Sequence, residues 1–204
     1  MKKQRINLYT RFERLWHWVQ AAFFIVLFLT GFEVHGSIHL MGYEKAHSVH
    51  IYVGWSLLIL TAFAIFWHMT TGAWRNYLPT SENILKVADF YLRGIFKGEP
   101  HPYEKTPASK LNPLQRLAYL WLKIFAMPLM FATGVLYFYY NNWSSWGINA
   151  SLGVVAALHT FVAFLLLAFL VLHTYLSTTG GTVWTYIKEM ITGYEELDVD
   201  QEPA

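Results

Sequence analysis

Cysteine is absent from this 204-residue chain. Without thiols the chain can form no disulfide, no thiolate-bound iron–sulfur cluster, no thioether-attached haem and no cysteine-based zinc site. Any metal centre must therefore use histidine nitrogen or oxygen ligands.

Charged residues are also scarce. They make up 14% of the chain, against roughly 25% in an average soluble domain, while 55% of the residues are hydrophobic. Four apolar blocks, at about 15–34, 49–70, 117–140 and 152–176, are each long enough to cross about 30 Å of hydrocarbon as a helix. We therefore predict an all-α protein: a four-helix bundle in a membrane, forming a single domain over residues 1–204.

Lysine and arginine are distributed unevenly around these blocks. The N-terminal tail and the loop at about 75–112 are rich in them, whereas the turn after the first block holds only Lys45 and the turn at 141–149 holds none. The positive-inside rule then places both termini in the cytoplasm. The first block is too long for a cleavable signal peptide and no small-residue cleavage site follows it, so we expect it to remain as a spanning helix.

Two segments outside the blocks have distinct patterns. Residues 84–96 are amphipathic and predict a cytoplasmic surface helix, followed by an irregular proline-rich loop at 99–107. The acidic C-terminal tail, residues 194–204, predicts a solvated or partner-facing end.

Nine histidines occur, and their depth in the membrane separates them. Three lie in loops, where we expect solvated side chains: His35, His39 and His101. Five lie inside an apolar block or at the mouth of one: His17, His50, His68, His159 and His173. Ionisable groups at such depth are costly, so they usually face the bundle interior as ligands, relays or paired groups.

The predicted topology groups four of these histidines into two pairs. His159 and His173 are 14 residues apart in the fourth block, close to four helical turns and about 21 Å of rise, so they project from one side of that helix. His17 lies at the inner depth of His173, and His50 at the outer depth of His159. Each pair offers two neutral imidazoles, which are good axial ligands for haem iron.

Other residues leave alternatives open. His47, one turn before His50, would replace it as the outer ligand. His68 is five turns after His50 and would ligate the inner iron in place of His17, bind a haem propionate, handle a proton near a quinone, or have a structural role only. Arg11 and Arg14 would offset the charge of inner haem propionates, or serve topology alone.

Glycines lie where flat macrocycles would need space. Gly31 follows His17 by 14 residues, Gly54 follows His50 by one turn, and Gly134 lies toward the outer end of the third block. Ordinary close packing of membrane helices would explain them equally.

Four segments resemble the membrane-bound di-haem cytochrome b subunits of formate dehydrogenases (gamma subunit), nickel–iron hydrogenases and thiosulfate reductases. They are Arg-Phe-Glu-Arg-Leu-Trp-His-Trp (11–18), His-Ser-Val-His-Ile-Tyr-Val-Gly (47–54), Leu-His-Thr-Phe-Val-Ala (158–163) and Val-Leu-His-Thr-Tyr (171–175). The resemblance covers nearly all of the chain from residue 11 to about residue 193. It implies two haem b groups, held by His17 with His173 and by His50 with His159.

The resemblance also implies a quinone pocket beside the cytoplasmic haem, at the start of the third helix. Family members have an Asn followed closely by a Gln there, and this chain has Asn112 and Gln115. Asn112 is equally suited to cap that helix, with Pro113 as its first residue. A further implication is an iron–sulfur or multihaem partner subunit at the outer face.

We therefore expect a di-haem electron-transfer subunit in a bacterial or archaeal cytoplasmic membrane, linking a quinone pool to an outer-face redox partner, with no nucleic-acid partner. One alternative is a transporter of protons or metal ions, which would need histidines or carboxylates clustered at one depth. Another is a plain membrane anchor whose histidines have no role.

Overall fold

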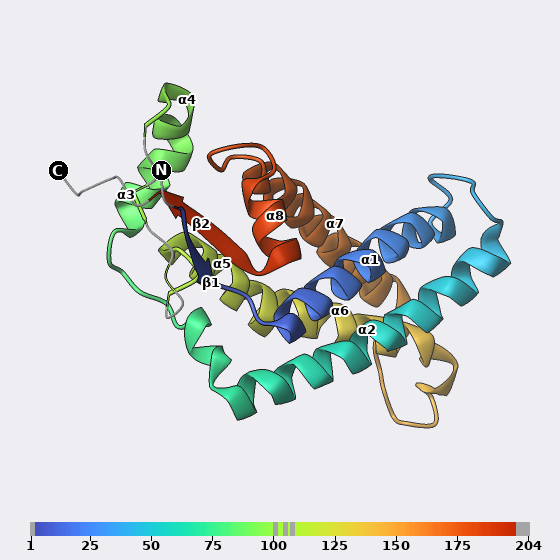
Figure 1. The fold of residues 1–204 in the computed structure, drawn as a ribbon. Coiled ribbons are helices and arrows are strands. Elements are labelled where there is room, and N and C mark those ends of the chain that lie inside the picture. The colour runs from blue at the N-terminus through green and yellow to red at the C-terminus, as the bar shows by residue number, and fades with distance from the viewer. Residues whose placement is uncertain (1–2, 100–101, 104–105, 107–108, 199–204) are drawn as a thin grey trace. The chain divides into compact units, whose positions relative to one another are not determined.

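The computed structural model describes residues 3–99, 102–103, 106 and 109–198 (Figure 1). The chain divides into two compact units, which are described separately. The first unit comprises Met1–His17, His68–Leu120 and His173–Ala204, and the second comprises Trp18–Trp67 and Trp121–Leu172. The expectation of a single domain stays a prediction.

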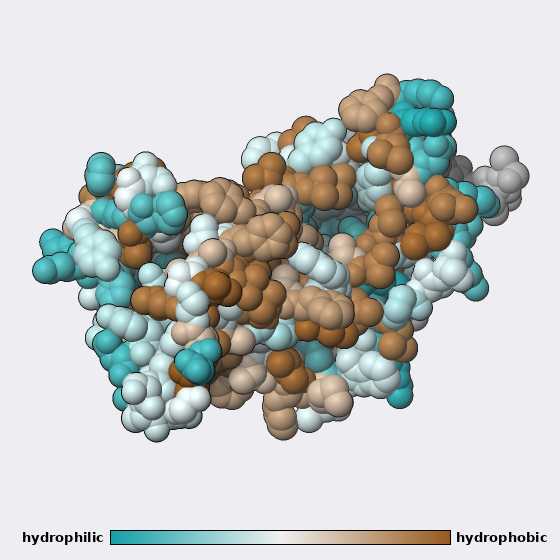
Figure 2. Space-filling view, turned by 180° about the vertical axis from the view of Figure 1, so that it is seen from behind, coloured by the Kyte–Doolittle hydropathy of each residue, from teal (hydrophilic) through white to brown (hydrophobic). Residues whose placement is uncertain are grey.

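Four helical spans are long and apolar enough to cross a membrane: α1 (Arg11–Val34), α2 (Tyr43–Thr71), the continuous run Pro113–Phe138, and α7 (Leu152–Ser177). The predicted all-α membrane fold is thereby confirmed, and the orientation of the termini stays a prediction. Large apolar side chains such as Ile59, Phe63 and Phe161 are exposed on these helices, and Figure 2 shows hydrophobic residues over much of one face. In a membrane such side chains meet lipid rather than water.

Three of the spans begin several residues before the apolar blocks do, because polar caps set their starts. At α1, the Glu13 N–H donates to Thr10 Oγ1 (3.3 Å) and the Thr10 N–H donates to Glu13 Oε2 (2.7 Å), which is a capping box. Just before α2, the buried carboxylate oxygen Oε1 of Glu33 accepts three backbone N–H groups, from residues 40, 41 and 42, at 2.7–2.9 Å, and so fixes the turn that leads into this helix. A hydropathy profile does not detect such polar groups, so it places the starts of these helices too late.

The third span has three parts: α5 (Pro113–Trp121), a π-helical stretch η3 (Leu122–Ala126) and α6 (Met127–Phe138). Pro128 is the second residue after the π-helical stretch. Proline has no N–H to donate to the preceding turn and crowds its carbonyl, which favours the wider turn observed there.

The two ends of the chain form a small sheet in the first unit, drawn as blue and red arrows in Figure 1. Strand β1 (Lys3–Asn7) pairs antiparallel with β2 (Tyr194–Asp198), and Arg5 Nη2 binds Glu196 Oε1 at 3.0 Å. Residues 194–198 of the predicted acidic tail thus form a strand paired with a basic N-terminal segment, and the expectation of a solvated or partner-facing end stays a prediction. Residues 199–204 of the predicted tail lie outside the described residues.

The loop at 75–112 contains short elements. The predicted surface helix at 84–96 is present as α3 (Ile84–Asp89), a π-helical turn η2 (Phe90–Gly94) and α4 (Ile95–Lys97). Much of the predicted proline-rich loop at 99–107, namely residues 100–101, which include His101, 104–105 and 107, lies outside the described residues. The remaining elements are η1 (Ala73–Tyr77), η4 (Tyr140–Asn142) and α8 (Thr185–Thr192).

Candidate cofactor-binding sites

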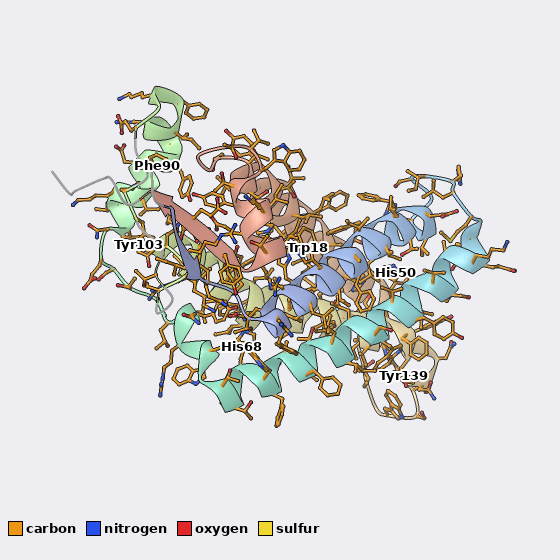
Figure 3. All side chains as sticks on the ribbon, viewed as in Figure 1. Trp18, His50, His68, Phe90, Tyr103 and Tyr139 are labelled. Atoms are coloured by element: carbon orange, nitrogen blue, oxygen red, sulfur yellow. The ribbon has the colours of Figure 1, made fainter. Side chains whose placement is uncertain are left out.

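His50 and His159 face one another in the second unit. His50 comes from α2, where Figure 3 labels it, and His159 comes from α7. Their ring centroids are 6.4 Å apart, with an angle of 74° between the ring planes. The alternative outer ligand, His47, is instead exposed and stacks on Tyr43 at 5.8 Å.

A threonine hydroxyl orients each of these two imidazoles. Thr30 Oγ1 donates to the Val26 carbonyl (2.8 Å) and lies 3.0 Å from His50 Nδ1. Because the single hydroxyl hydrogen goes to the carbonyl, the oxygen accepts from the imidazole, and Nδ1 of His50 carries a proton. The lone pair is then on Nε2, as a metal-binding imidazole requires.

The same arrangement recurs at His159. Thr133 Oγ1 donates to the Leu129 carbonyl (2.8 Å) and lies 3.0 Å from His159 Nδ1. Sequence analysis missed both threonines. The signal for them was present, since Thr30 and Thr133 each directly precede a glycine already singled out.

Those glycines permit the close approach of the rings. A Cβ on Gly31 would lie 3.4 Å from His50 Cε1, and one on Gly134 would lie 3.3 Å from His159 Cε1. A methyl group would already touch each imidazole, so a side chain that extends beyond Cβ would displace the ring. A Cβ on Gly54 would meet no atom within 4 Å among the described residues.

His17 and His173 form the second pair, in the first unit. Their ring centroids are 6.1 Å apart, with an interplanar angle of 53°. The Tyr119 hydroxyl lies 3.3 Å from His173 Nδ1, so a phenol here occupies the place that a threonine has at His50 and His159.

His68, at the end of α2 in Figure 3, is buried in the first unit with 6% of its surface exposed. Its Nε2 lies 3.3 Å from the Tyr77 hydroxyl, and its ring meets that of Trp16 edge-on at 5.4 Å. Burial raises the pKa of the Tyr77 hydroxyl above its usual range, and the negative charge of Glu13 raises it further. The phenol of Tyr77 is therefore protonated at neutral pH.

The two arginines predicted to bind propionates differ in their surroundings. Arg14 Nη1 donates to the Ile191 carbonyl at 2.5 Å, while Arg14 Nε is buried and has no hydrogen-bond partner among the described residues. Arg11 is exposed. Since Arg14 precedes His17 by three residues on α1, the two side chains share a helix face.

Asn112 and Gln115 bond to one another at the start of α5. The Gln115 N–H donates to Asn112 Oδ1 (2.9 Å) and the Asn112 N–H donates to Gln115 Oε1 (3.0 Å). Asn112 Nδ2 also donates to the Tyr91 hydroxyl at 3.1 Å. The prediction of Asn112 as N-cap, with Pro113 first in the helix, is confirmed, and a role of the two residues at a quinone stays a prediction.

Both histidine pairs have the spacing that one metal ion would require. With metal–nitrogen bonds of about 2 Å and each ring centre about 1 Å beyond its nitrogen, two imidazoles on opposite sides of one ion have centroids roughly 6 Å apart. By the distance between their rings, both histidine pairs fit a haem held by two histidines. Arg14 Nε offers a buried hydrogen-bond donor for a haem propionate. Among the described residues, no group of three or more His, Cys, Asp or Glu side chains is placed to hold a metal ion.

A family model described as Prokaryotic cytochrome b561 matches residues 8–193. The chain is also similar to "Putative cytochrome YdhU" of Escherichia coli (strain K12), with 31% identity over 196 residues that cover 94% of this chain and 75% of that protein. No solved structure matches the chain. The family match includes all four spans and both histidine pairs.

Proposed function

Since the chain belongs to the prokaryotic cytochrome b561 family, it is a multi-pass membrane protein that binds haem b and transfers electrons, and we propose that it is a di-haem, quinone-linked subunit of an oxidoreductase complex. The observation that carries the proposal is the presence of two separate histidine pairs, with centroids 6.1 Å and 6.4 Å apart. Each pair would hold one haem through its two imidazoles.

The proposal assigns roles to residues around each pair. Haem b supplies reversible one-electron chemistry at its iron. Thr30 and Thr133 hold His50 and His159 with Nε2 free to ligate, and Tyr119 supports His173. Arg14, with its buried Nε–H, would bind a propionate of the group that His17 and His173 would hold.

The electron donor and acceptor would be a quinone and a partner subunit. Quinol or quinone reacts at the cytoplasmic side, beside His17 and His173, where His68, Asn112 and Gln115 are the candidate residues. An iron–sulfur or multihaem subunit docks at the outer face of a bacterial or archaeal cytoplasmic membrane. Support comes from the resemblance to di-haem subunits and from the buried polar side chain of His68.

A haem count on the purified full chain tests the proposal. A pyridine haemochrome assay should give two b-type haems per chain, and one each in His173→Ala and His50→Ala, because each variant loses one axial ligand. His35→Ala, which alters an exposed loop histidine, should keep both. A wild-type chain with a single haem, or a His173→Ala chain with two, would overturn the assignment.

A further inference from the structure

Polar and aromatic side chains of the first unit form a connected series that starts at a candidate haem ligand. The Tyr119 hydroxyl meets His173 Nδ1 at 3.3 Å, and the Tyr119 ring meets that of Tyr77 edge-on at 6.5 Å. The Tyr77 hydroxyl then meets His68 Nε2 at 3.3 Å. Four separate elements, α2, η1, α5 and α7, thus contribute to one buried polar series.

At its other end, the series lies close to His17, the partner of His173 in the pair. His68 packs edge-on against Trp16, which directly precedes His17 in α1. An ionisable ring buried at the end of a membrane span costs free energy that an apolar side chain of similar size would not. Packing alone therefore does not account for a histidine at position 68.

A largely buried ion pair lies in the same unit as this series. Lys110 Nζ contacts Glu13 Oε1 and Oε2 at 2.8 Å and 2.9 Å, and the two side chains are 13% and 12% exposed. The negative charge of Glu13 also raises the pKa of the Tyr77 phenol. Tyr77 and Lys110 both belong to the loop at 75–112, so the series and the ion pair share that loop.

We propose that His68 and Tyr77 relay protons from a quinol, oxidised beside the His17–His173 pair, to the Glu13–Lys110 ion pair. This inference rests on the proposed function. It deepens that function by assigning the proton acceptor, which the proposed electron transfer leaves open.

The chemistry balances with ferric haem b as the one-electron oxidant. Oxidation of one quinol breaks two O–H bonds and releases two protons and two electrons, the electrons leaving singly to two ferric haems. His68 takes a proton at Nδ1 and gives one up from Nε2 to the Tyr77 oxygen, whose own proton leaves toward the Glu13 carboxylate. Glu13 then releases this proton to cytoplasmic water, and the proton that remains on the His68 imidazole moves from Nδ1 back to Nε2. The relay is thereby restored, and the second proton follows the same route.

Rapid mixing of the oxidised, haem-loaded chain with a short-chain ubiquinol or menaquinol tests the relay. We expect His68→Gln and Tyr77→Phe each to slow haem reduction at least about tenfold, since a positioned proton acceptor contributes roughly 10²–10⁴-fold to such steps. Haem content and full reduction by dithionite should match wild type. The double variant should be no slower than the slower single variant, because both residues act on one route.

Two substitutions at exposed positions serve as matched controls: His35→Gln and Tyr140→Phe, which should react at the wild-type rate. Wild-type rates in both relay variants would overturn the relay and leave the quinone linkage intact. Loss of one haem in His68→Gln would also overturn it, by making His68 a ligand. A wild-type chain that quinol does not reduce would overturn the quinone linkage itself, and the relay with it.

Discussion

At His50 and His159, a hydrogen bond to a threonine decides which ring nitrogen is available to a metal. In each case the hydroxyl hydrogen is used on a backbone carbonyl of the threonine's own helix, so the oxygen can only accept from the imidazole. An acceptor on Nδ1–H increases the electron density of the ring and fixes its rotation. These threonines would therefore tune His50 and His159 as haem ligands as well as orient the two rings.

We predict that Thr30→Val raises the midpoint potential of one haem by roughly tens of millivolts, because it removes a hydrogen bond worth about 1 kcal/mol that favours the oxidised iron. A spectroscopic redox titration measures the shift. Thr61→Val is the matched control, since the Thr61 hydroxyl bonds only to the Leu57 carbonyl in the described contacts. Equal potentials in Thr30→Val and wild type would show that the hydroxyl does not act on a ligand.

At the scale of the helices, side-chain caps determine where the spans begin. Hydropathy indicated that the third span starts near residue 117, whereas Asn112 and Gln115 start the helix at Pro113. The cap was predictable from the residues, since Asn before Pro is a common start signal. The π-helical stretch at 122–126 was not, because proline effects on a preceding turn depend on what packs around it.

We predict that Asn112→Ala lowers the free energy of unfolding by about 1 kcal/mol, while Asn112→Ser retains most of it, because serine is also a good N-cap. Thermal unfolding followed by loss of the haem absorbance compares the variants. Asn149→Ala, in an exposed loop, should leave the midpoint unchanged. If Asn112→Ser keeps wild-type stability yet slows reduction by quinol, the side chain acts on the quinone as well as on the helix.

For the whole molecule, the distribution of charge predicts the orientation in the bilayer. Lysine and arginine gather in the N-terminal tail and the loop at 75–112, whereas the region between the first two blocks holds only Lys45 and the turn at 141–149 holds none. The positive-inside rule translates this asymmetry into cytoplasmic termini. The pairing of β1 with β2 is consistent with this orientation, because it requires residues 3–7 and 194–198 to lie on the same side of the membrane.

Because the chain contains no cysteine, single cysteines can report this orientation without a background. We predict that a membrane-impermeant maleimide labels Ser37→Cys and Ser144→Cys in intact cells with a permeabilised outer envelope, and labels Ser81→Cys only once the inner membrane is opened. All three positions are exposed. Labelling of Ser81→Cys from outside would reverse the topology.

The sequence by itself determined the four spans and the choice of histidines to pair, because both follow from local properties. Hydropathy depends only on composition within a window, and the 14-residue spacing of His159 and His173 depends only on helical periodicity. The tertiary structure alone decided which polar groups meet those histidines, as Thr30 does His50 and Tyr119 does His173. It also decided the contact of His68 with Tyr77 and the pairing of the two chain ends. The reason is that hydrogen bonds between elements depend on how each helix is rotated and shifted along its neighbours. Apolar residues, which cover most of these helices, do not determine that rotation and shift.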